Sequence, residues 1–127
     1  MRIGIPKEIK AQEYRVGLTP DAVADLVAAG HSLFVETGAG CGSGYSDDDY
    51  LAAGAQLSVS MASLYRDAQL IVKVKEPQAS EVVLLQADHR LFCYLHLAPT
   101  PDLTTSLMAS GALCVAYETI TDEQGRL

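Results

Sequence analysis

Cysteine is scarce in this 127-residue chain. The sequence has three cysteines, Cys41, Cys93 and Cys114, which lie far apart and form no CxxC pair. This pattern excludes a disulfide framework and indicates free thiols in a reducing compartment. Long hydrophobic runs are missing too, since no apolar stretch approaches the roughly 18 residues of a transmembrane helix. The first residues contain no apolar signal region, so the expected location is cytoplasmic.

Basic residues are also few. Nine lysines and arginines face 16 acidic residues, and the formal net charge is −7. This balance argues against nucleic acid or an anionic membrane as a partner. It remains compatible with a small anionic substrate, because a few well-placed cations decide such a site.

Motifs that bind nucleotides or metals are not found. Four glycines, Gly38, Gly40, Gly42 and Gly44, follow a predicted strand, but the third glycine of a GxGxxG fingerprint is replaced by Ser43 or Tyr45 in either register. The chain contains no phosphate-binding GKS/T sequence, and its three histidines are too scattered for a metal site. We therefore predict a tight loop here, with positive φ at several glycines, and no cofactor or metal site in this chain.

What the chain does contain is a regular alternation of apolar runs and amphipathic stretches. The length and the 49% hydrophobic content suit one domain with one core. Alternating strands and helices predict an open, doubly wound parallel α/β sheet, Rossmann-like or flavodoxin-like. The expected strands are 2–6, 32–36, 55–59, 69–74, 91–95 and 112–117, and the expected helices are 20–29, 46–53, 60–67, 79–85 and 101–110.

Two positive residues follow predicted strands and are candidate binding groups, because ligands of such sheets bind beyond the carboxyl ends of the strands. Arg15 lies in the loop after the first strand, where a guanidinium can hold a carboxylate by two parallel hydrogen bonds. Lys75 lies at the end of strand 69–74, and Pro77 prevents that strand from continuing. Lys73 is the less certain candidate. The alternative for all three is an ordinary solvated side chain.

His96 and Glu118 end the next two strands. Histidine suits proton transfer near neutral pH, although a buried structural histidine is the common alternative. Glu118 could orient a histidine or a lysine, or simply be solvated. His31 and His89 precede strands, at the opposite edge, and have no predicted role. Two cations and a histidine at one edge suit a small carboxylate whose neighbouring atom exchanges a proton.

Several motifs resemble a known family. Residues 1–8 (MRIGIPKE), 13–16 (EYRV), 18–20 (LTP) and 35–40 (VETGAG) resemble the opening of alanine dehydrogenases and of the proton-translocating transhydrogenase alpha subunit. Residues 72–77 (VKVKEP) and 94–98 (YLHLA) resemble alanine dehydrogenases more specifically, and 116–119 (AYET) fits as well. Transhydrogenases usually lack the histidine that corresponds to His96.

The resemblance implies a role for each matched residue. Arg15 and Lys75 would bind the carboxylate of L-alanine or pyruvate, and His96 would be the general acid/base. Tyr94 and Glu118 would be supporting residues. The implied reaction is the reversible NAD-dependent oxidative deamination of L-alanine to pyruvate and ammonium.

The resemblance also bears on domain organisation. Residues 1–127 correspond to the N-terminal part of a substrate domain, and NAD would be bound by a further domain that this chain lacks. The intact enzyme is expected to be a homohexamer, and the chain alone is expected to be inactive. Two alternatives are the N-terminal domain of a transhydrogenase alpha subunit and a non-catalytic module that binds a small carboxylate.

Overall fold

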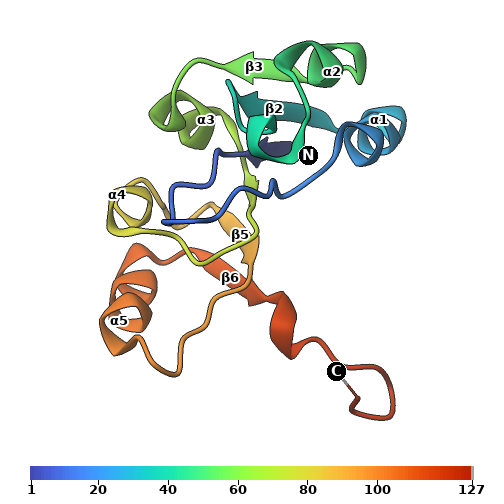
Figure 1. Cartoon of the computed structure of the whole chain (residues 1–127). Helices are drawn as coiled ribbons and strands as arrows, with labels where there is room; N and C mark the ends of the chain where they lie inside the picture. The colour runs from blue at the N-terminus through green and yellow to red at the C-terminus, as the bar shows by residue number, and fades with distance from the viewer. Residues whose placement is uncertain (127) are drawn as a thin grey trace.

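The computed structural model describes residues 1–126 and shows an open sheet of six parallel strands (Figure 1). The strand order is β3-β2-β1-β4-β5-β6, and every neighbouring pair is parallel. The predicted doubly wound α/β fold is therefore confirmed. The strands are β1 (Arg2–Ile5), β2 (Ser32–Glu36), β3 (Gln56–Ser58), β4 (Leu70–Val72), β5 (Arg90–Cys93) and β6 (Leu113–Ala116).

A helix follows each of the first five strands, and short polar residues begin most of these helices. Thr19, Ser46 and Ser60 each accept a hydrogen bond from a backbone N–H of the first turn, which satisfies an otherwise unpaired donor. Two single turns of 3₁₀ helix accompany the helices, η1 (Cys41–Ser43) and η2 (Tyr117–Thr119). The helices are α1 (Pro20–Ala28), α2 (Asp47–Ala52), α3 (Met61–Asp67), α4 (Ala79–Val82) and α5 (Pro101–Ser110).

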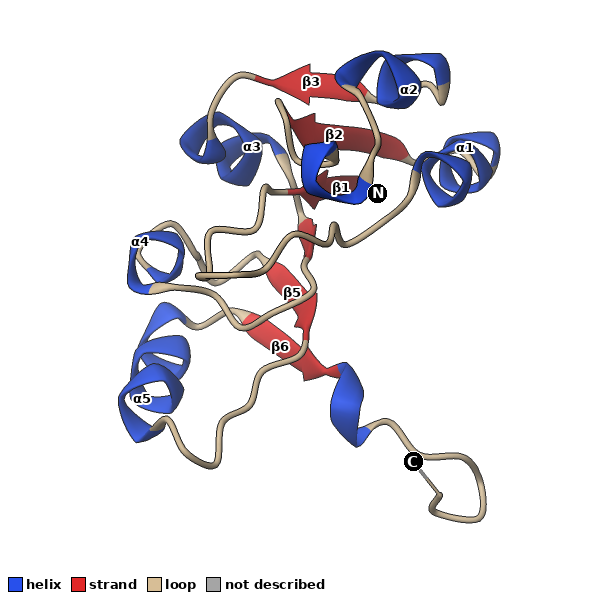
Figure 2. Ribbon diagram, in the orientation of Figure 1, coloured by secondary structure: helices blue, strands red, loops and turns tan. Residues whose placement is uncertain are grey.

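The core is divided between the two faces of the sheet, with helices on both sides of the strands (Figure 2). On one face, Val23 of α1 and Tyr50 of α2 pack with strand residues such as Val35. On the other face, Leu64 of α3 and Leu107 of α5 belong to a second cluster. Among the described helices, none is long and apolar enough to cross a membrane.

The predicted elements are all present, but most of them are shorter than expected. Strand β4 ends at Val72 instead of residue 74, because the backbone N–H of Val74 donates to the carboxylate of Glu8 and not to β1. The last strand ends at Ala116, where η2 begins. Helix α4 ends at Val82, three residues before the predicted end.

The direction of winding changes between β1 and β4. Helix α1 follows β1 on one face, and α4 follows β4 on the other, so the winding reverses between these two neighbouring strands. Open sheets of this kind bind ligands beyond the carboxyl ends of the strands at such a point, and we call this region, between the loops after β1 and β4, the crevice. The loop after β1 approaches β4 closely at Gly17, where a Cβ atom would lie 2.6 Å from the carbonyl oxygen of Val72. Only glycine fits this contact, which places residues 7–18 beside the end of β4.

Candidate functional site

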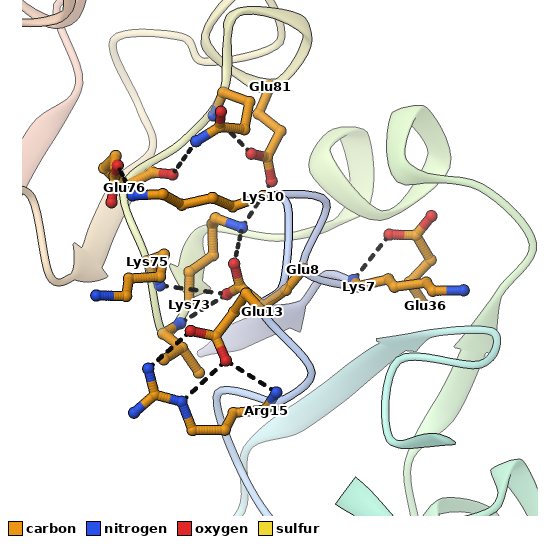
Figure 3. A network of polar contacts seen from close by, with 12 residues as sticks. Lys7, Glu8, Lys10, Glu13, Arg15, Glu36, Lys73, Lys75, Glu76 and Glu81 are labelled. Atoms are coloured by element: carbon orange, nitrogen blue, oxygen red, sulfur yellow. Dashed lines mark hydrogen bonds and ion pairs between the residues drawn. The ribbon is translucent and has the colours of Figure 1, made fainter. Parts of the chain in front are cut away.

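The crevice between β1 and β4 contains the predicted cations, which come from two loops. Arg15 lies in the loop after β1, and Lys73 and Lys75 lie in the segment after β4 (Figure 3). Three carboxylates, those of Glu8, Glu13 and Glu81, lie among them in the same view. The strand-end argument therefore placed the cations in the correct part of the fold.

The guanidinium of Arg15 is held by Glu13. Its Nε donates to Glu13 Oε1 at 2.9 Å and its Nη2 donates to Oε2 at 2.7 Å. The Arg15 hydrogen bonds are the main reason why the pKa of Glu13 falls to about 2, with partial burial opposing and the charge of Lys75 adding to the effect. About two thirds of the Arg15 side chain stays exposed, so its position is defined and its outer surface is accessible to an anion.

Lys73 and Lys75 differ in their surroundings. The Lys73 side chain is fully buried, with Nζ 3.0 Å from Glu8 and 2.8 Å from Glu81. Lys75 is only half-buried, and its ammonium lies 4.7 Å from the centre of the Tyr94 ring, a distance at which a cation is attracted by the π face. Lys73 is thus already paired, and Lys75 is the more exposed of the two lysines.

Tyr94 connects Lys75 with His96. The imidazole of His96 stacks on the Tyr94 ring, with centroids 5.6 Å apart and planes at 28°. The ring centroid of Tyr117 lies 6.2 Å from that of Tyr94, and the Tyr117 hydroxyl donates to the carbonyl of Val74 at 2.6 Å. Burial raises the pKa of Tyr117, and the charge of Arg15 partly offsets this rise. A continuous set of contacts therefore leads from the crevice to His96.

The backbone at His96 has an uncommon conformation. Strand β5 ends at Cys93, and His96 follows in an exposed loop with φ of 49°, a left-handed value that few non-glycine residues adopt. Glu118 supports this turn, because its carboxylate accepts the N–H of Leu95 at 3.0 Å and that of His96 at 2.9 Å. Burial would raise the pKa of Glu118, but these backbone donors lower it on balance.

Glu118 therefore acts on the backbone of the His96 loop and not on the imidazole. The sequence left open whether Glu118 orients a histidine or a lysine or is simply solvated, and the hydrogen bonds of its carboxylate go to the backbone of the loop that carries His96. His31 and His89 precede β2 and β5, at the amino ends of the strands. His89 is buried and bonded to the carbonyl of Tyr65 and the N–H of Gln86, which is a structural role.

The glycine-rich loop forms one wall of a hollow of about 370 Å³ beside Arg15. Gly38 and Gly44 have positive φ, as the predicted tight loop requires, but Gly40 and Gly42 do not. The amides of Cys41, Ser43 and Gly44 bond to carbonyls of the same loop, and that of Gly38 bonds to Asp47. These amides are thus engaged within the loop and by Asp47.

Residues 1–126 offer neither a metal cluster nor a second hollow lined by the candidate residues. Within this part of the chain, no group of three or more His, Cys, Asp or Glu side chains is arranged to hold a metal ion. A larger hollow of about 690 Å³ lies between α4 and α5, but Arg15, Lys75 and His96 do not line it. We place the candidate site by its chemistry, at the crevice and the adjoining Tyr94–His96 pair.

The chain was compared with known proteins. Residues 4–127 match the family described as "Alanine dehydrogenase/PNT, N-terminal domain". An alanine dehydrogenase of Halomonas elongata is 55% identical over 127 residues, which is all of this chain and 34% of the relative. The chain thus spans about a third of the length of the curated relatives that it matches.

Two solved structures are similar to the model. An L-alanine dehydrogenase superposes with a TM-score of 0.95 and 50% identity, over 98% of this chain and 34% of that one. A transhydrogenase from Sinorhizobium meliloti superposes with a TM-score of 0.88 and 27% identity, over 94% of this chain and 36% of that one. Both likenesses extend over almost the whole domain.

Proposed function

The chain belongs to the alanine dehydrogenase/PNT N-terminal domain family, and from that premise we propose that it is the substrate-binding part of an NAD-dependent L-alanine dehydrogenase. The enzyme would convert L-alanine to pyruvate and ammonium, reversibly. One observation carries the proposal for the site: Lys75 and His96 both contact the ring of Tyr94, at the carboxyl ends of the neighbouring strands β4 and β5.

In this proposal the two cations bind the substrate carboxylate. Lys75 and the exposed part of Arg15 would each donate to it, and hydrogen bonds between charged partners are the strong ones. A carboxylate held at two points limits the orientations of Cα, so that its hydrogen can face an acceptor. This chain's residues would bind and orient the substrate.

His96 is proposed as the proton-transfer group. During oxidation a base must accept a proton from the substrate ammonium or from the water that attacks the imine, and a positioned base contributes roughly 10²–10⁴-fold. Glu118 would fix the loop, and Tyr94 would restrict the imidazole by stacking. NAD would accept the hydride when bound, and we expect a further domain to bind it, because the glycine-rich loop here does not suit a dinucleotide.

A transhydrogenase role is the second candidate, and the sequence identities to the relatives argue against it. The similar alanine dehydrogenases are 44–55% identical to this chain, whereas the similar transhydrogenase is 27% identical. The presence of His96 also favours the dehydrogenase.

Replacing the binding lysine in the complete enzyme tests the proposal. We expect the enzyme to form NADH from L-alanine, and Lys75→Ala to raise the KM for pyruvate at least about tenfold, because a charge-assisted contact to the carboxylate is lost. Arg90→Ala removes an exposed cation at the opposite edge of the sheet and should leave this KM unchanged. Equal effects of the two variants, or no alanine-dependent NADH, would refute the proposal.

A further inference from the structure

Three charged residues beside the site are enclosed in the protein. Lys73 donates to Glu8 Oε2 at 3.0 Å and lies 2.8 Å from Glu81 Oε1, and the three side chains are 0%, 2% and 0% exposed (Figure 3). We call Lys73, Glu8 and Glu81 the buried triad. The proposed reaction uses none of them directly.

Filling part of a core with three charged side chains costs free energy. Removing charges from water costs several kcal/mol per ion, and well-packed apolar residues often give equal or greater stability. Burial pulls the pKa of Lys73 down, but Glu81 and Glu8 raise it above its ordinary value, so the lysine keeps its charge. Because the buried triad adds little net stability, its effect on the neighbouring backbone is the more informative property.

The other carboxylate oxygens of the buried triad bind the backbone of the segment that carries Lys75. Glu8 Oε1 accepts the N–H of Val74 at 2.7 Å and lies 3.5 Å from that of Lys75. Glu81 Oε2 accepts the N–H of Gln78 at 2.7 Å. Segment 73–78 is therefore bonded to the buried triad at both ends, with Lys75 between the two attachments.

We propose that Glu8, oriented by Lys73, is a positioning residue that sets the backbone of Lys75 across the crevice between β1 and β4. This inference rests on the proposed function, in which Lys75 binds the substrate carboxylate. The attachment crosses the crevice, because Glu8 follows β1 and Lys75 follows β4. It fixes the distance between the two loops that supply Arg15 and Lys75. A misplacement of about 1 Å at such a group can cost 10²-fold in rate.

The test uses Glu8→Gln in the complete enzyme. Glutamine keeps the size of the side chain and one acceptor oxygen, but it loses the ion pair with Lys73. We expect the KM for pyruvate to rise about tenfold, the effect of weakening one charge-assisted contact, with the KM for the nicotinamide cofactor and the melting temperature nearly unchanged. Glu36→Gln is the matched control, because Glu36 accepts the N–H of Lys7 at 3.0 Å and so holds the same loop on its other side, towards β2.

A double-mutant cycle separates positioning from a general structural role. If Glu8 acts through Lys75, Glu8→Gln should have almost no further effect on the KM for pyruvate in a Lys75→Ala background. An equal effect in both backgrounds, or an equal effect of Glu36→Gln, overturns the inference. If Glu8→Gln does not fold, Glu8→Asp retains the charge with a shorter reach and should show the same dependence on Lys75.

The two proposals fail in distinguishable ways. If Lys75→Ala leaves the KM for pyruvate unchanged, the proposed function is wrong, and the inference falls with it. If Lys75→Ala raises this KM and Glu8→Gln does not, only the inference is wrong.

Discussion

The two sides of the candidate site are built in different ways. On the crevice side, Lys75 lies in a segment whose backbone is bonded to buried carboxylates at both ends. On the other side, His96 lies in an exposed loop beyond β5, where one carboxylate, Glu118, accepts the N–H groups of the turn. Figure 1 shows β6, the edge strand next to β5, and the segment after it that leads away from the sheet towards the C-terminus.

The difference corresponds to the two tasks that we propose. A group that binds a carboxylate must be in place before the substrate arrives, since any ordering on binding lowers the affinity. A group that transfers protons must also exchange them with water, and an exposed loop gives it that access. Tyr94 joins the two sides, because Lys75 lies over its ring and His96 stacks on it.

The largest effect is expected when the crevice side loses its central cation. Lys73→Ala leaves the carboxylates of Glu8 and Glu81 buried without their counter-ion, which typically costs about 3–5 kcal/mol. That is a large part of the roughly 5–15 kcal/mol by which a domain is stable. Urea unfolding followed by circular dichroism measures the change.

Lys7→Ala is the control for this experiment. Lys7 precedes Glu8 in the same loop, but it is exposed, so its replacement should change the free energy of unfolding by about 0.5 kcal/mol or less. If Lys73→Ala lowers the free energy of unfolding by less than about 1 kcal/mol, the crevice side is no more rigid than the side that carries His96.

On the open side, the expected effect is on the rate and not on stability. His96→Asn removes the proton-transfer group, while asparagine still tolerates the left-handed backbone at this position. We expect kcat of the complete enzyme to fall by roughly 10²-fold, which is about 2.7 kcal/mol in activation free energy. The KM for pyruvate should change much less. Stopped-flow or steady-state assays of NADH give both constants, and near-normal turnover would exclude the acid/base role.

Much of this fold was predictable from local patterns. The caps at Thr19, Ser46 and Ser60 and the alternation of strands with helices predict the elements and the parallel sheet. The carboxyl ends of parallel strands share one edge, so Arg15 and Lys75 could be assigned to one part of the fold before any coordinates were known.

The carboxylates of the site were not predictable in this way. Glu8 and Glu13 lie in a long loop, and Glu81 lies in a short helix, so no periodicity indicates which side chains turn inwards. In the sequence, Glu8 and Glu81 lie 65 and 8 residues from their common partner Lys73, and such pairings depend on tertiary structure. Only the burial of a lysine carries a hint, because a charge inside a sheet needs a counter-ion.

The smallest expected effect concerns the pair on the accessible part of the crevice, Glu13 and Arg15. The pKa of Glu13 is about 2, below the ordinary value of 4.5, mainly because Arg15 hydrogen-bonds to the ionised form. A carboxylate with a depressed pKa stabilises the fold above its ordinary pKa, and this contribution disappears as the pH falls from 4.5 towards 2. Because most of the Arg15 side chain is exposed, the contribution should be at most about 1 kcal/mol.

Glu13→Gln tests this by unfolding titrations between pH 6 and pH 2. Wild type should be slightly more stable than the variant at pH 6, and the two should converge as Glu13 becomes protonated. Since the arginine of the pair is exposed to solvent, 1 M salt should remove most of the difference at pH 6. A difference in stability that survives both low pH and high salt would group Glu13 with the buried triad. The rigid part of the crevice would then extend beyond Arg15 instead of ending at Glu8.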